Sequence, residues 1–96
     1  MENISYDIHD FEKLLYIFKK LSPGIGRLVL SPMTHSINVK ELVIEAAQIN
    51  NELVDLRRDI FTLNPTENII KFENLSARIE KYKINLYDLL VESVST

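Results

Sequence analysis

The chain of 96 residues contains no cysteine. This absence excludes disulfide bonds, thiolate nucleophiles and cysteine-ligated metal sites, and it suits a reducing cytoplasm, where we expect the chain to act. No apolar run approaches the ~20 residues that a membrane-spanning helix needs, so we expect no membrane partner. The first ten residues are acidic and lack the apolar segment of a secretory signal peptide.

An excess of basic residues is also missing. The net charge is −3 and the isoelectric point is about 5.3, with no charged tail, which argues against a protein that binds nucleic-acid phosphates. Hydrophobic residues make up 46% of the chain and charged residues 26%, as in ordinary soluble proteins. The length of 96 residues predicts a single domain over 1–96, and the frequent Ile, Asn and Lys hint at an AT-rich bacterial or viral genome.

Glycine and proline are scarce and clustered. Both glycines and two of the three prolines lie in 21–36, which leaves long uninterrupted segments on either side. Over 6–21, apolar residues recur at gaps of three and four and predict a first helix. Ser5 or Asp7 would cap it, and Ser22-Pro23-Gly24 would end it, because proline cannot continue the hydrogen bonding and glycine suits a left-handed exit.

Two longer segments carry an a/d heptad pattern. A second helix is predicted over 38–63, with Asn38 as N-cap and Glu41 as its capping-box partner. A third is predicted over 65–94, where Asn64 and Pro65 form a strong start signal. The apolar seam positions are Val39, Leu42, Ala46, Ile49, Leu53, Leu56, Ile60 and Leu63 in the second helix, and Phe72, Leu75, Ile79, Tyr82, Leu86 and Leu89 in the third.

The link between these two helices is so short that they should be antiparallel neighbours. Pairing their apolar seams places the large Tyr82 opposite the small Ala46, as close packing requires. The same register brings together the flanking pairs Asp59 with Lys71, Glu52 with Arg78, and Glu45 with Asn85. The predicted fold is an all-α three-helix bundle, built on a long antiparallel hairpin with a shorter N-terminal helix.

Residues 22–37 are expected to form a long connection that covers one end of the hairpin. Gly24 and Gly26 do not make a phosphate-binding loop, because no strand precedes them and no Lys-Ser/Thr pair follows. Leu28, Val29 and Leu30 are predicted to plug the end of the hairpin. Loops of this length within a compact domain are often functional, so a ligand loop stays open as an alternative.

Few residues suggest catalysis. His9 and His35 are the only histidines, and a dyad of His35 with Ser31 or Ser36 is the one enzymatic arrangement that the sequence offers. The basic residues Arg57, Arg58, Arg78, Lys81 and Lys83 alternate with acidic ones, as on solvated helix faces. We expect no enzyme, no metal and no cofactor.

The third helix carries a second apolar stripe opposite its seam. Ile70, Ala77, Ile84 and Val91 recur every seven residues, and Tyr87 lies beside them. The second helix has a lesser flank of Val43, Ala47, Val54 and Phe61. One alternative is that the first helix and the Leu28–Leu30 segment cover these surfaces and close a monomeric bundle. The other is that the stripe on the third helix binds a partner.

The sequence therefore favours a small, non-enzymatic helical protein that binds another protein or itself, with a homodimer expected. Adaptors, chaperones, immunity proteins and phage or viral inhibitors use scaffolds of this size. The residues expected in the interface are Ile70, Ala77, Ile84, Tyr87 and Val91. The main alternative is a small dimeric DNA-binding regulator or antitoxin, although the acidic balance and the hairpin-like helices disfavour it.

Overall fold

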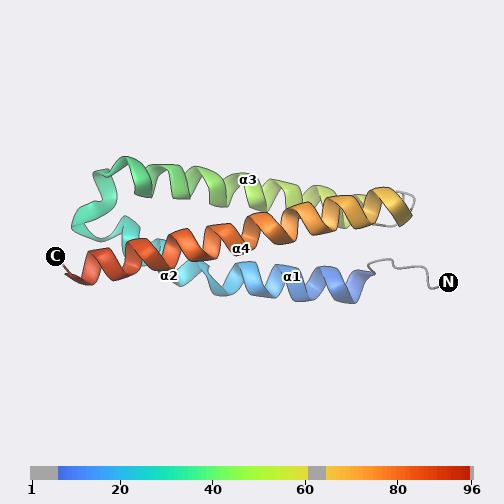
Figure 1. Cartoon of the computed structure of the whole chain (residues 1–96), viewed down its shortest axis with the longest axis horizontal. Helices are drawn as coiled ribbons and strands as arrows, with labels where there is room; N and C mark the ends of the chain where they lie inside the picture. Colours follow the sequence, from blue (N-terminus) through green and yellow to red (C-terminus); the bar gives the residue numbers. More distant parts are fainter. Residues whose placement is uncertain (1–6, 61–64, 96) are drawn as a thin grey trace.

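A computed structural model of the chain describes residues 7–60 and 65–95. In chain order the elements are α1 (Ile8–Lys20), α2 (Ser22–Val29), the short 3₁₀ helix η1 (Pro32–His35), α3 (Ile37–Asp59) and α4 (Pro65–Ser95). The molecule is a rod of 53 × 22 × 18 Å in which α3 and α4 form an antiparallel hairpin and α1 and α2 run along it (Figure 1). The predicted all-α helical bundle is confirmed.

The heptad seams form the core of the hairpin. Among the described residues, every predicted seam position is buried or partly buried. Lys71 Nζ lies 3.2 Å from Asp59 Oδ2, and Arg78 pairs with Glu52, so both predicted charge pairs are present and the predicted register is confirmed. Glu45 and Asn85, the third expected pair, line the same groove, and Glu45 accepts a hydrogen bond from Arg78 Nη2 at 2.7 Å.

Helix α1 starts at a capping box. The Asp7 carboxylate accepts hydrogen bonds from the amides of His9 and Asp10, and the Asp10 carboxylate accepts one from the Asp7 amide. The hydrogen bond from the Asp10 amide is the main cause that holds the pKa of Asp7 below its ordinary value. Helix α1 buries Phe11, Leu14 and Phe18 against the hairpin.

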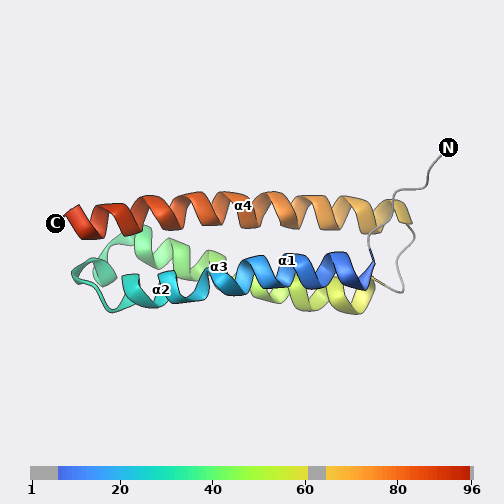
Figure 2. The same cartoon turned by 90° about the horizontal axis from the view of Figure 1, so that it is seen from below.

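The rings of α1 and α4 meet inside the bundle. The centroids of Phe18 and Tyr82 lie 5.6 Å apart, with the ring planes tilted by 46°. Figure 2 shows α1 and α2 in line, both on one side of the α3–α4 hairpin. The N-terminal third of the chain therefore fills one groove of the hairpin and leaves the opposite side of α4 uncovered.

The expected connection over 22–37 is largely helical, which corrects the sequence prediction. Helix α1 ends at Lys20 as predicted, but Pro23 then lies in the first turn of α2, where a missing amide hydrogen costs nothing, so a second helix starts there. No described residue has a positive φ, so Gly24 makes no left-handed exit. Of the expected plug, only Leu28 is fully buried; Val29 is exposed and Leu30 is 89% exposed.

The starts of α3 and α4 were predicted with specific N-cap residues. Helix α3 begins one residue before the predicted start, and its N-cap is Ser36, whose Oγ accepts a hydrogen bond from the Val39 amide at 3.1 Å. Asn38 is therefore inside the first turn and the predicted capping box is wrong. The predicted Asn64 cap and the seam position Leu63 lie outside the described residues.

Candidate functional site

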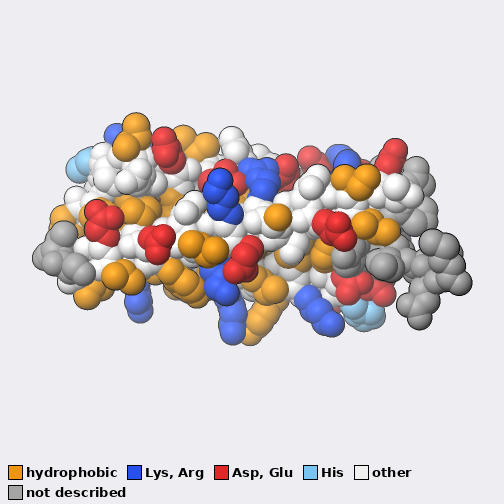
Figure 3. Space-filling model, viewed as in Figure 1, with side chains coloured by type: hydrophobic (Ala, Val, Ile, Leu, Met, Phe, Trp, Pro, Cys, Tyr) orange, Lys and Arg blue, Asp and Glu red, His pale blue; other side chains and the backbone are white. Residues whose placement is uncertain are grey.

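The outer stripe of α4, defined as Ile70, Ala77, Ile84, Tyr87 and Val91, is exposed. The exposed fractions are 54% for Ile70, 52% for Ile84, 49% for Tyr87 and 67% for Val91, and Ala77 is exposed as well. The alternative that the N-terminal helix covers this surface is wrong, because α1 and α2 pack in the groove between α3 and α4. Figure 3 shows hydrophobic side chains recurring along α4, with charged side chains between them.

The outer face of α3 is less continuous. Ile37, Ile44 and Val54 are exposed there, but Asn51 and Arg58 occupy the heptad position that continues the Ile37 and Ile44 row. The apolar flank predicted for this helix from the sequence did not include Ile37 and Ile44, because the polar Asn51 and Arg58 interrupt their seven-residue row. Phe61, which the sequence assigned to this flank, lies outside the described residues.

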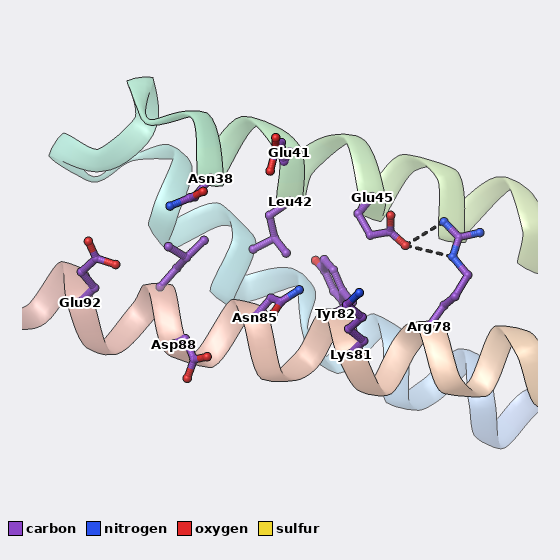
Figure 4. A pocket seen from close by; sticks show the side chains of 11 residues that line it. Asn38, Glu41, Leu42, Glu45, Arg78, Lys81, Tyr82, Asn85, Asp88 and Glu92 are labelled. Carbon is purple, nitrogen blue, oxygen red and sulfur yellow. Dashed lines mark hydrogen bonds and ion pairs between the residues drawn. The ribbon is translucent and has the colours of Figure 1, made fainter.

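A groove of about 650 Å³ lies between α3 and α4, on the side away from α1. Figure 4 shows its side chains projecting from both helices. Its rim carries the carboxylates of Glu41, Glu45, Asp88 and Glu92 and the cations of Arg78 and Lys81. Leu42, Tyr82 and Leu89 line its apolar part, and Asn38 and Asn85 complete the described lining.

Arg78 bridges the two helices at one end of this groove. Its Nε and Nη2 donate to Glu45 Oε1 at 3.0 and 2.7 Å, and Nη2 lies 3.3 Å from Gln48 Oε1. Arg78 also pairs with Glu52, and a smaller hollow of about 230 Å³ continues beyond it. The guanidinium group therefore divides the seam into two hollows and fixes the register of the hairpin.

Tyr82 forms part of the groove floor. The residue is only 2% exposed, and burial raises the pKa of its phenol to about 12. Its large ring fits the seam because Ala46 is small, and Figure 4 shows its hydroxyl pointing across the groove towards α3. No histidine is among the described residues that line the groove.

The serines near His35 serve as local caps. Ser31 Oγ donates to the Leu28 carbonyl at 2.7 Å and accepts from the Met33 amide, while Ser36 caps α3. Within 7–60 and 65–95, neither serine forms a hydrogen bond with His35, so the structure does not assemble the dyad that the sequence offered. His9 and His35 are both exposed and lie on different elements.

The basic residues do not gather into one patch. Arg58 pairs with Asp55 at 3.5 Å and with Asp59 at 3.2 Å, and the hydrogen bond to Asp59 is the main cause that raises the pKa of Arg58.

Among the described residues, no cluster of three or more acidic or histidine side chains is placed to hold a metal ion. No helix of the described ranges combines the length and the apolar character that crossing a membrane requires.

Comparisons of the chain with protein-family models, with curated proteins and with solved structures found no match.

Proposed function

We propose that this chain is a non-enzymatic helical interaction module of the cytoplasm, which binds a protein surface through the outer stripe of α4. The observation that carries this proposal is the exposure of Ile84 near the middle of a 31-residue helix whose opposite side packs against α3, α1 and α2. An apolar row of this length costs solvation free energy when it faces water, and docking against another apolar surface removes that cost.

The stripe has the spacing of a helix-docking face. Ile70, Ala77, Ile84 and Val91 recur every seven positions, so they stay on one side of α4 over about three heptads, as in helix-on-helix interfaces. Tyr87 adds an aromatic anchor of the kind that is enriched in the centre of protein interfaces. Adaptor, chaperone, immunity protein and phage or viral inhibitor are the classes that such a surface suits.

Site-specific photo-crosslinking tests this proposal in the cells that express the protein. A photoreactive residue at position 84 should capture a protein partner, either this chain or another. The same residue at Gln48, an exposed position on α3, is the matched control and should capture much less. Equal capture at both positions, or none at position 84, would contradict a binding role for the outer stripe.

A further inference from the structure

The charged residues on either side of the outer stripe indicate what it binds. On one side of the row formed by Ala77, Ile84 and Val91 lie Asn74, Lys81 and Asp88, and on the other side lie Glu73, Glu80 and the stripe residue Tyr87. Lys81 and Asp88 are exposed, and among the described residues neither has an ion-pair partner in its own chain. Their charges are therefore available to a molecule that covers the stripe.

We propose that the occupant is a second copy of this chain, docked antiparallel along α4 with Ile84 on the two-fold axis. This inference rests on the proposed function and names its partner. With Ile84 facing Ile84 of the second copy, Ala77 faces Val91 of the second copy on both sides of the axis. A small residue then opposes a larger one, which lets the helices approach closely.

The flanks of this register are complementary in charge. In an antiparallel helix pair, positions on the same flank face each other, and this rule places Asp59 beside Lys71 within the chain itself. Applied to two copies of α4, it places Lys81 opposite Asp88 of the second copy, twice by symmetry. On the other flank Glu80 faces Tyr87 of the second copy, whose phenol is a hydrogen-bond donor to a carboxylate.

The neighbouring registers are less favourable. Moving the second copy by one heptad in one direction places Lys81 opposite Lys81 and Glu80 opposite Glu80. A shift of the second copy by a further seven residues in that direction places Glu73 opposite Glu80 of the second copy. A shift by seven residues in the other direction places Asp88 opposite Asp88 of the second copy. Like charges at these flanks oppose association, so of the four antiparallel registers compared only the one centred on Ile84 pairs Ala77, Ile84 and Val91 without repulsion.

A parallel arrangement fits the stripe less well. It would set Ala77 against Ala77 of the second copy and leave a gap between the helices there, and it would align the two helix dipoles in the same direction. The antiparallel arrangement fills the gap with Val91 and opposes the dipoles. A contact of one helix face is smaller than the ~800 Å² per partner of a standard interface, so we expect reversible association in the micromolar range or weaker.

Cysteine pairing tests the arrangement directly, because the natural chain contains no cysteine. Under mild oxidation, a mixture of Ala77→Cys and Val91→Cys should form the 77–91 disulfide between copies, and each variant alone should form far less dimer. Ile84→Cys alone should also form a disulfide across the axis. Efficient pairing of Ala77→Cys with itself would show a parallel or shifted arrangement and overturn the proposal.

Charge reversal tests the flanks. Lys81→Asp and Asp88→Lys should each weaken dimerisation by about 3- to 30-fold, since each change affects two symmetric contacts, and the double variant should restore it. Circular dichroism of each variant checks that the fold is retained. Single variants that dimerise as well as the natural chain, or a double variant that stays weak, would contradict the register.

The solution mass of the natural chain separates this inference from the proposed function. A monomer at the highest concentrations reached in sedimentation equilibrium would overturn the dimer. If crosslinking from position 84 still captured a different protein, the proposed function would stand and the partner named here would be wrong. Dimerisation without any crosslink at position 84 would contradict both.

Discussion

Gly24 of α2 lies directly against Leu86 of α4. A β-carbon built on Gly24 would lie 3.1 Å from Cδ2 of Leu86 and 3.2 Å from Cδ1 of Leu90. Leu86 is fully buried, so its side chain has little room to move away. The glycine is therefore favoured by close helix packing and not by a turn, since the backbone there is helical.

The two glycines of α2 form a matched pair for testing this contact. A β-carbon added to Gly26 would meet no neighbouring atom within 4 Å, so Gly26→Ala should stabilise the fold by about 0.4–1 kcal/mol through the lower entropy of the unfolded chain. Gly24→Ala gains the same term but overpacks the core, at a cost of about 1–3 kcal/mol. Urea unfolding should rank Gly26→Ala above the natural chain and Gly24→Ala below Gly26→Ala. Equal stabilisation by both substitutions would show that α2 does not approach α4 this closely.

The start of α3 gives a second prediction. Ser36→Ala removes the hydroxyl that accepts the Val39 amide and should cost about 1 kcal/mol of unfolding free energy. Asn38→Ala should be neutral or stabilise by a few tenths of a kcal/mol, because alanine is the better residue inside a helix. Thermal unfolding of the two variants measures the difference, and the reverse order would place the cap at Asn38.

Burial of Tyr82 predicts a loss of stability in alkali. The pKa of its phenol is about 12 in the folded chain and about 10 when unfolded, so the folded state holds the proton more tightly. The stability from this difference is fully present below pH 10 and is lost as the pH rises towards 12, by up to about 2–3 kcal/mol. Unfolding in urea across this range should show a shallower decline for Tyr82→Phe, and identical slopes for the two proteins would contradict the burial.

The hairpin was predictable because its signals are local and redundant. The a/d rows run through both helices, and the opposite charges of Asp59 with Lys71 and Glu52 with Arg78 specify the same register independently. The exposed stripe of α4 was predictable as well, since Ile84 and its seven-residue neighbours lie opposite the seam. What the sequence did not decide was whether α1 would cover them.

The segment over 22–37 was mispredicted because its proline and glycine residues are compatible with both the start and the end of a helix. Pro23 stops a helix in its interior but suits its first turn, and Gly24 serves equally as a helix end or as a close contact between helices. Only the packing partner Leu86, which is far away in the sequence, decides between these roles. The weaker helical signal was the spacing of Leu21 and Leu28, which both face the core.

If the outer stripe of α4 serves association and not folding, then Ile84→Glu and Ile44→Glu should differ in self-association but not in stability. Both residues are about half exposed, and they occupy the same heptad position on the two hairpin helices. Sedimentation equilibrium combined with urea unfolding should find Ile84→Glu folded but at least about tenfold weaker in self-association, with Ile44→Glu unchanged in both. An Ile84→Glu variant that unfolds would show that Ile84 stabilises the fold. One that associates as well as Ile44→Glu does would show that the outer stripe takes no part in self-association.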